Sequence, residues 1–157
     1  MAIRGDSKEY DLLKRWCETS KLKSPLDKVR SGMTCEIGVR EGLGSKIILE
    51  SFNPICHHAV DPYGNLEYQH YDDGPAYTCD YTDDMYRQML IDFSEYDNFL
   101  PWKMTDTRYM QMFHHITHYD FVHFDGPHMT RDVLREAIWF ADRSDIGTRF
   151  VFDDYPK

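Results

Sequence analysis

The sequence has no long hydrophobic run: its uninterrupted apolar stretches are only a few residues long, too short to cross a lipid bilayer. Its first residues, Met1–Asp6, also lack the apolar stretch of a signal peptide. From these two absences we expect a cytoplasmic protein without a membrane partner.

Basic residues and cysteines are also scarce. Lysine and arginine together number 18, against 27 aspartates and glutamates, which gives a net charge of -9. Because proteins bind nucleic-acid phosphates through clustered lysine and arginine, this balance argues against a nucleic-acid partner. It favours neutral, cationic or metal-assisted ligands. The four cysteines show neither zinc-ligand spacing nor a disulfide framework, so we expect reduced, structural thiols.

The hydrophobic pattern of the 157 residues predicts one domain of alternating strands and helices. An N-terminal helical segment is expected over residues 1–32. Strands are predicted at 35–39, 57–61, 100–104, 119–124 and 150–152, and helices at 45–52, from 83 onward, at 107–115 and at 130–142. This alternation predicts an α/β fold, Rossmann-like and doubly wound, with a mainly parallel sheet flanked by helices.

Two other segments carry expectations of their own. Residues 62–82 contain five tyrosines among glycine, aspartate, asparagine and proline, without clear periodicity. A loop of this length in a compact domain is usually functional or mobile, so we expect a lid or a substrate wall. The helix at 130–142 is predicted to carry an apolar stripe and to be closed by Ile146-Gly147. The stripe consists of Val133, Leu134, Ala137, Ile138 and Ala141.

Acidic residues recur at the ends of the predicted strands. Glu36 opens the glycine run of the first strand, Asp61 closes the second and Asp125 the fourth. Asp153 and Asp154 follow the fifth. In an open α/β sheet, ligands bind in the crevice beyond the carboxyl ends of the strands, where the strand order reverses. Carboxylates at that edge point to a nucleoside-type cofactor on one side and a metal on the other.

The glycine run supports the cofactor half of this interpretation. Gly38 and Gly42, in a strand-to-helix turn, let the backbone approach a ligand closely, and the helix start offers free N–H groups. Asp61 lies about twenty residues further on, where an acid can bind two ribose hydroxyls. The alternatives are a turn that uses glycine for steric reasons alone, and for Asp61 the role of a helix cap or of a turn residue before Pro62.

The run Glu36-Ile37-Gly38-Val39-Arg40-Glu41-Gly42 resembles the first motif of the class I S-adenosylmethionine-dependent methyltransferases. The resemblance implies that Glu36, Gly38 and Gly42 line the cofactor and that Asp61 holds its ribose. Asp106, in Thr105-Asp106-Thr107, stands where that family often has a polar contact to the adenine. Simple helix capping is the alternative for Asp106.

Two motifs support the metal half of this interpretation: Asp125-Gly126-Pro127-His128 and Asp153-Asp154-Tyr155. If their strands are neighbours, the strand ends lie about 4.8 Å apart, and Asp125 can share a cation with Asp153 or Asp154. Carboxylates without a sulfur ligand suit Mg²⁺, or else Mn²⁺ or Ca²⁺. His128 could face the same site. The alternatives are a local hydrogen bond at a helix start for His128 and a solvated turn for the aspartate pair.

Together these two motifs resemble the metal-dependent sugar O-methyltransferases of the macrocin type and the related cephalosporin hydroxylase-like proteins. The resemblance implies Mg²⁺ bound by Asp125, Asp153 and Asp154, with His128 as the general base. It also implies an enzyme that transfers a methyl group from S-adenosylmethionine to a hydroxyl of a small molecule, with a sugar as one candidate.

Two other functions stay open at this point. One is a methyltransferase-like module that binds a cofactor or a metal without turnover. The other is an iron oxygenase built on His123-x-Asp125, which would need a further histidine downstream of His128, where the sequence has none. The other histidines, His57-His58 and His114-His115-x-x-His118, are expected to be structural.

The pattern departs from the class I methyltransferases at one place. That family normally continues past the fifth strand with a helix and an antiparallel strand pair, whereas this chain stops at Tyr155-Pro156-Lys157. We expect a domain that lacks this strand pair: either the chain is a fragment, or its sheet edge is completed by another chain or left short. Because an uncovered sheet edge promotes pairing with another chain, a homo-oligomer is a further expectation.

Overall fold

A computed structural model describes residues 7–20, 32–64 and 66–153. It begins with helix α1 (Ser7–Ser20), which lies within the expected N-terminal helical segment. The rest of that segment, residues 1–6 and 21–31, lies outside the described residues, as does Asp154. None of the helices in the described ranges is both long and apolar enough to cross a membrane.

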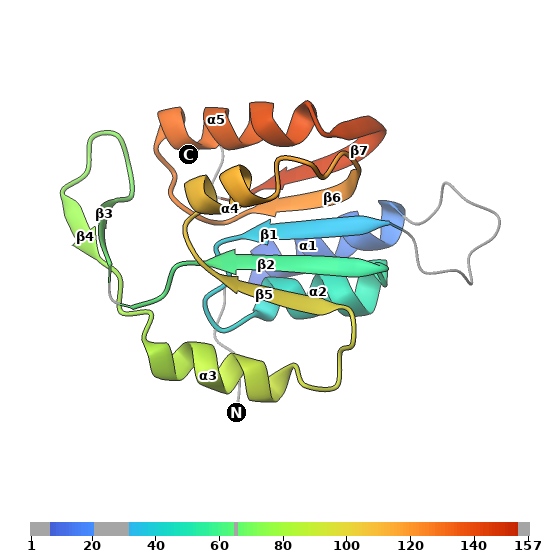
Figure 1. The fold of residues 1–157 in the computed structure, drawn as a ribbon, viewed down its shortest axis with the longest axis horizontal. Coiled ribbons are helices and arrows are strands. Elements are labelled where there is room, and N and C mark those ends of the chain that lie inside the picture. Colours follow the sequence, from blue (N-terminus) through green and yellow to red (C-terminus); the bar gives the residue numbers. More distant parts are fainter. Residues whose placement is uncertain (1–6, 21–31, 65, 154–157) are drawn as a thin grey trace.

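Five strands form a single parallel sheet, and Figure 1 shows these strands side by side. They are β1 (Met33–Ile37), β2 (Cys56–Asp61), β5 (Phe99–Lys103), β6 (Tyr119–Phe124) and β7 (Ser144–Phe152). Their order across the sheet is β5-β2-β1-β6-β7, and every neighbouring pair is parallel. The order reverses between β1 and β6, which makes this the switch point where open α/β sheets bind ligands. The predicted Rossmann-like fold is confirmed.

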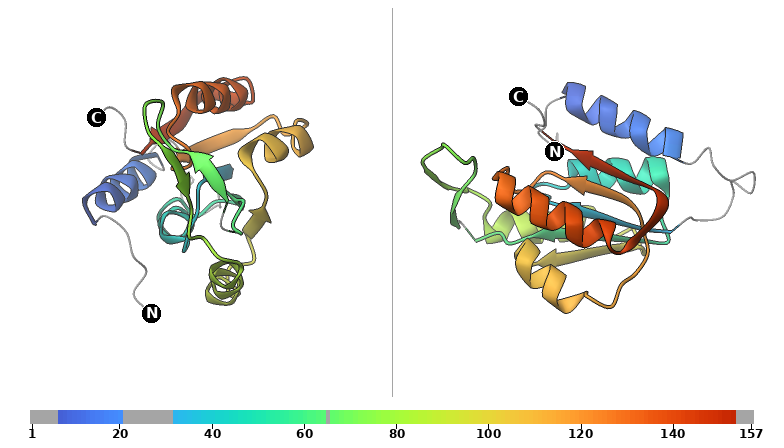
Figure 2. Two further views of the ribbon diagram at one scale, coloured as in Figure 1. Left: turned by 90° about the vertical axis from the view of Figure 1, so that its left-hand side faces the viewer. Right: turned by 90° about the horizontal axis from the view of Figure 1, so that it is seen from above.

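Helices cover both faces of the sheet (Figure 2). Helix α1 packs with α2 (Leu43–Phe52) on one face, where Leu13 and Ile48 meet Phe121 of β6. Helices α4 (Asp106–Met112) and α5 (Thr130–Ala141) cover the other face, where Tyr109 and Phe140 pack on β1 and β6. Helix α3 (Asp83–Asp92) closes the β2–β5 side through Met89.

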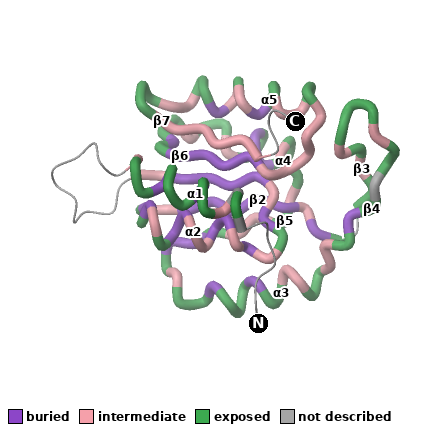
Figure 3. Tube along the Cα trace, turned by 180° about the vertical axis from the view of Figure 1, so that it is seen from behind, coloured by how far each residue is buried: buried purple, intermediate pink, exposed green. Residues whose placement is uncertain are grey.

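The burial of the strands follows from this layering. The central strands form a continuous buried band between the helices (Figure 3), because residues on both of their faces meet apolar side chains. Cysteines contribute to this core: all four are free thiols, and Cys17, Cys35 and Cys79 are buried. Apart from the beginning of β7, the strands and helices have bounds close to those predicted.

The C-terminal helix and strand differ from the expectation in two ways. In α5, Leu134 and Ile138 are 57% and 54% exposed, while Glu136 and Phe140 are buried. The predicted stripe is therefore not the buried face of the helix. Strand β7 begins at Ser144, so Ile146-Gly147 lies inside the strand and does not end the helix. The beginning of β7 is exposed, and its pairing with β6 is irregular there. Its sequence pattern therefore resembles that of a turn.

The tyrosine-rich stretch of residues 62–82 contains a short hairpin, where a loop without strands was expected. Strands β3 (Glu67–Gln69) and β4 (Ala76–Thr78) pair antiparallel. Backbone hydrogen bonds at the base of the hairpin join Gly64 to Tyr81 and Cys79 to Leu66. The hairpin stands beyond the carboxyl ends of the strands, at the left of Figure 1. Its role as a lid stays a prediction.

Candidate functional site

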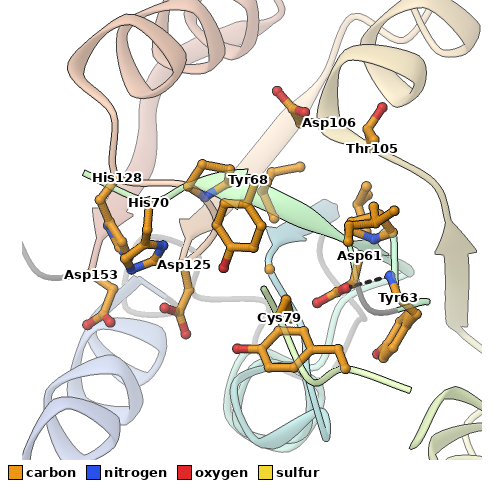
Figure 4. Close-up of a pocket in the computed structure, with 18 of the residues that line it drawn as sticks. Asp61, Tyr63, Tyr68, His70, Cys79, Thr105, Asp106, Asp125, His128 and Asp153 are labelled. Atoms are coloured by element: carbon orange, nitrogen blue, oxygen red, sulfur yellow. Dashed lines mark hydrogen bonds between the residues drawn. The ribbon is translucent and has the colours of Figure 1, made fainter. Parts of the chain in front are cut away.

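A cavity of about 420 Å³ lies at the carboxyl edge of the sheet, against the β3–β4 hairpin. Its walls come from the ends of β1, β2, β6 and β7, the start of α4, and the hairpin. The side chains that carry chemistry in these walls are Asp61, His70, Asp106, Asp125, His128 and Asp153 (Figure 4). The predicted cofactor and metal residues therefore meet largely in one space.

The turn after β1 packs directly on the turn after β6. Gly38 has a φ of 86°, and a side chain there would collide with the backbone carbonyl of Asp125. The amide of Asp125 in turn donates to the carbonyl of Ile37, at 2.7 Å between N and O. Glycine is required at residue 38 because both the left-handed backbone and the close approach exclude a Cβ atom. Gly38 lines the cavity, whereas Gly42 contacts the ring of Phe93 and does not.

Asp61 braces the same turn from the end of β2. Its side chain is almost fully buried, and its two oxygens accept hydrogen bonds from the amides of Val39 (2.9 Å), Arg40 (3.0 Å) and Tyr63 (3.1 Å). Burial raises the pKa of Asp61, and the three N–H donors oppose that rise. The residue is thus a turn-bracing acid, as the alternative proposed, and it also lines the cavity. Its contact with a ribose stays a prediction.

Glu36 lies beneath the turn, and it is not one of the residues that line the cavity. It is 1% exposed, and its Oε1 lies 2.8 Å from Nδ1 of His123. The hydroxyl of Ser45, at the start of α2, donates to its other oxygen and lies 3.0 Å from Nε2 of His57. The structure therefore places Glu36 where it anchors α2 to the sheet.

The histidines of this buried network are structural, as expected. Burial lowers the pKa of His57 to about 3, so its ring is neutral and hydrogen-bonds to Thr34 and Ser45. His123 hydrogen-bonds to Glu36, and it is neither a lining residue of the cavity nor part of the group formed by Asp125, His128 and Asp153. The described residues therefore do not bring His123 and Asp125 together as the oxygenase alternative requires.

Asp125, His128 and Asp153 converge at one end of the cavity. One ligand atom of each lies within 4.8 Å of those of the other two, and all three side chains are partly buried. They meet because β6 and β7 are neighbours: Phe124 pairs with Phe152, and the amide of Asp153 donates to the carbonyl of Phe124 at 2.9 Å. The two carboxylates at this separation fit a divalent cation such as Mg²⁺, and the imidazole of His128 lies beside them.

His70, from the hairpin, completes this end of the cavity. Its ring lies edge-on to His128 with the centroids 4.5 Å apart, and its carbonyl accepts a hydrogen bond from the amide of His128 at 2.9 Å. The ring of Tyr71 stacks with that of His128 at 5.6 Å between centroids, and it also lies 4.4 Å from the ring of His70. Sequence reasoning missed His70, since residues 62–82 lack the periodicity that would place one residue against another.

The hairpin is also tied to the start of α5. The Asp72 carboxylate accepts hydrogen bonds from the amide (3.1 Å) and the hydroxyl of Thr130. Met129, at the N-cap position of α5, provides no side-chain cap. Asp72 supplies the acceptor instead, and its negative charge also suits a helix N-terminus. The bonds to Thr130 lower the pKa of Asp72.

We expect Asp72→Ala to loosen the hairpin, because this change removes both bonds to Thr130. Hydrogen exchange of the amides over residues 66–79 should become faster, while the amides of β1 and β6 keep their protection. Asp73→Ala, which removes the neighbouring exposed carboxylate, is the matched control. Equal exchange in wild type and Asp72→Ala would show that this contact does not hold the hairpin.

At the far end of the cavity, Asp106 is held by α5. Its carboxylate forms an ion pair with Arg135 and lies within hydrogen-bonding reach of Glu136. Thr105, and not Asp106, caps α4, because its hydroxyl accepts from the amide of Arg108. The helix-capping role considered for Asp106 therefore belongs to Thr105. Asp106 also lines the cavity, while its carboxylate is held by Arg135 and Glu136.

Glu136 is a second residue that sequence reasoning missed. It is 1% exposed, and its Oε1 has no hydrogen-bond partner within the described ranges. Burial, and then the nearby charge of Asp106, raise its pKa to about 9. Glu136 is therefore protonated at neutral pH and can donate its proton to Asp106.

Solved structures with this fold are found among methyltransferases. A proposed caffeoyl-CoA O-methyltransferase from Staphylococcus aureus aligns over 97% of this chain with a TM-score of 0.64 and 11% identity. An S-adenosylmethionine-dependent methyltransferase from Agrobacterium tumefaciens aligns over 94% with a TM-score of 0.61 and 10% identity. The fold is that of the class I methyltransferases.

A third structure with the methyltransferase fold contains the demethylated cofactor. It is the S-adenosylhomocysteine-bound methyltransferase of Podospora anserina, with a TM-score of 0.51 and 10% identity over 98% of this chain and 73% of its own. The present chain spans 59% and 45% of the Staphylococcus and Agrobacterium proteins. Neither the protein-family models nor the curated proteins compared with the sequence match it.

Proposed function

We propose that this protein is an S-adenosylmethionine-dependent O-methyltransferase that acts on a hydroxyl of a small molecule, such as a sugar, with a divalent metal ion. The observation that carries the proposal is the layout of the cavity. Asp61 and the Gly38 turn stand at the switch point of a methyltransferase fold, and the same cavity continues to Asp125, His128 and Asp153. A cofactor and an acceptor can thus meet in one space.

In this proposal, the cofactor half of the cavity holds the nucleoside. Asp61 would accept a hydrogen bond from a ribose hydroxyl with the lone-pair site that its three backbone donors leave. Asp106 would accept from the amino group of the adenine. Gly38, without a side chain, would let the methionine part lie against the backbone at the switch point. Glu36 would act on the cofactor only through the turn that it supports.

The acceptor half would hold the hydroxyl in line with the methyl group. Asp125 and Asp153, with the predicted Asp154, would bind Mg²⁺ or a similar cation, which lowers the pKa of a bound hydroxyl. The hydroxyl oxygen attacks the methyl carbon, and the bond from that carbon to sulfur breaks, with the electron pair passing to sulfur. His128 accepts the hydroxyl proton. Alignment of the two reactants supplies a large part of the rate.

The direct test is methyl transfer from labelled S-adenosylmethionine to a panel of sugars, polyols and phenols, with and without Mg²⁺. Transfer that requires the metal supports the proposal. Binding of S-adenosylhomocysteine without transfer to any acceptor would favour the cofactor-binding module. No binding by folded protein would leave only the fold in common with the methyltransferases.

We expect His128→Ala to slow methyl transfer by about 10²–10⁴-fold, since a positioned base contributes that much. The affinity for S-adenosylhomocysteine should stay close to that of the wild type, because His128 lies at the acceptor end. His118→Ala, which removes an exposed histidine paired with Asp145, serves as the control. Undiminished turnover in His128→Ala would remove the base assignment.

A further inference from the structure

The cavity wall provides no cation for an anionic part of a ligand. Among the described residues that line it, none is a lysine or an arginine. The cofactor of the proposed function, S-adenosylmethionine, ends in an amino-acid tail that carries a negatively charged carboxylate. A charged group is costly to take out of water unless it is paired. A cation that binds this carboxylate therefore has to stand at the rim of the cavity.

Arg40 stands at this rim, in the turn that follows β1. Its backbone is held by two residues of the cavity wall, because its amide donates to Asp61 at 3.0 Å and its carbonyl accepts from the hydroxyl of Tyr63 at 2.7 Å. Its guanidinium lies over the ring of Tyr81, a third wall residue, with 5.6 Å between Cζ and the ring centroid. The side chain is thus exposed and yet in contact with the wall.

The backbone conformation of Arg40 is one that suits glycine better. Its φ is 53°, in the left-handed region that a Cβ atom makes unfavourable. Gly38 and Gly42 of the same turn also have positive φ, and both lack a side chain. Strained backbone of this kind clusters at ligand-binding and active sites. An arginine at such a position indicates a use for its side chain.

The guanidinium of Arg40 has no anion of its own within the described ranges, since none of their ion pairs includes it. Two other cations near the carboxyl edge of the sheet are engaged. Lys103, at the end of β5, donates to Asp83 at 2.6 Å, and Arg135 pairs with Asp106. The ring contact of Arg40 is weak at an exposed site, so this guanidinium can turn to an anionic ligand.

We propose that Arg40 binds the carboxylate in the amino-acid tail of the cofactor. The inference rests on the proposed function, in which the methionine part of the cofactor lies against Gly38, two residues earlier in the same turn. A guanidinium matches a carboxylate with two parallel N–H···O bonds, a geometry that a lysine cannot reproduce. Arg40 thereby supplies the positive charge that the wall lacks.

The test is a calorimetric titration of the wild-type chain with two ligands. One is S-adenosylhomocysteine, and the other is its decarboxylated analogue, which keeps the amine of the tail and lacks only the carboxylate. We expect the analogue to bind on the order of tenfold more weakly. The difference should narrow at high salt, because Arg40 is exposed and its charge is screened. Equal affinity of the two ligands for the wild type would overturn the inference without any variant.

Variants of Arg40 locate the effect. Arg40→Met removes the charge and keeps an unbranched apolar side chain, so S-adenosylhomocysteine should bind on the order of tenfold more weakly while the analogue binds nearly as before. Arg40→Lys, with a charge but no fork, should retain only part of the difference.

Arg143→Met is the matched control. Arg143 also lies over an aromatic ring, that of Trp139 at 4.2 Å, but it is at the opposite end of the sheet, where its carbonyl accepts from the amide of Tyr119. This control should keep the full difference between the two ligands. Equal weakening of both ligands in folded Arg40→Met would make Arg40 a structural residue of the turn and overturn the inference.

The outcomes also separate this inference from the proposed function. A preference for S-adenosylhomocysteine that persists in Arg40→Met overturns the role of Arg40 and leaves the methyltransferase proposal standing. Failure of both ligands to bind to folded wild-type protein overturns the proposed function, and this inference with it. A preference that disappears in Arg40→Met and remains in Arg143→Met supports the two together.

Discussion

Asp61→Ala is expected to weaken binding of S-adenosylhomocysteine by about two orders of magnitude or more. A hydrogen bond from a ribose hydroxyl to the carboxylate would be lost, worth about 1.5–3 kcal/mol. The amides of Val39, Arg40 and Tyr63 would also lose their acceptor, so the turn that faces the cofactor would no longer be held. We therefore expect the free energy of unfolding to fall as well, by about 2–4 kcal/mol.

Calorimetric titration and urea unfolding of the same variant measure the two effects. Asp120→Ala is the matched control: its carboxylate also accepts from a backbone amide, that of Met33, but at the opposite end of the sheet. This control should lose some stability and keep its affinity for S-adenosylhomocysteine. If folded Asp61→Ala protein bound this ligand as tightly as wild type, Asp61 would be a turn-bracing residue only.

Glu136→Gln is expected to stabilise the protein at alkaline pH. The pKa of Glu136 is about 9 in the folded chain against 4.5 in its ordinary state, so only the unfolded chain releases this proton at intermediate pH. The contribution of Glu136 to the free energy of unfolding is greatest below pH 4.5. It falls as the pH rises toward 9, by up to about 1.4 kcal/mol per pH unit. Glutamine cannot ionise and keeps a donor for Asp106, so it removes this loss.

Urea unfolding at pH 5 and pH 8 tests the prediction. We expect Glu136→Gln to exceed wild type by about 1–3 kcal/mol at pH 8, and the two proteins to be nearly equal at pH 5. Glu95→Gln, a substitution of an exposed glutamate, should show no such difference. If Glu136→Gln were the less stable protein at both pH values, Glu136 would be ionised and paired in the folded chain.

The sequence predicted the strands and most helices because these depend on local periodicity. It also predicted that Asp61, Asp125 and Asp153 meet, since the carboxyl ends of parallel strands share one edge and β6 lies beside β7. It assigned Glu36 to the cofactor from its place in the motif. The structure instead turns that side chain to His123 and Ser45, beneath the cavity wall, because the pleat of β1 points it into the core.

The predicted apolar stripe of α5 shows where local patterns become ambiguous. Leu134 and Ile138 have the spacing of a buried face, and so do Glu136 and Phe140. The second pair is buried because Phe140 packs against the rings of Tyr119 and Phe124 on the sheet. Periodicity identifies a helix, but the packing partner decides which of two adjoining faces turns inward.

The sequence alone determined that this protein is an alternating α/β domain with carboxylates along one edge of its sheet. It could do so because periodicity and strand direction are local properties. Only the tertiary structure decided that His70 and Asp72 of the hairpin meet His128 and Thr130, residues separated by 58 positions in the chain. The same holds for the buried, protonated Glu136 beside Asp106. Such contacts depend on how distant segments pack, and no local pattern specifies them.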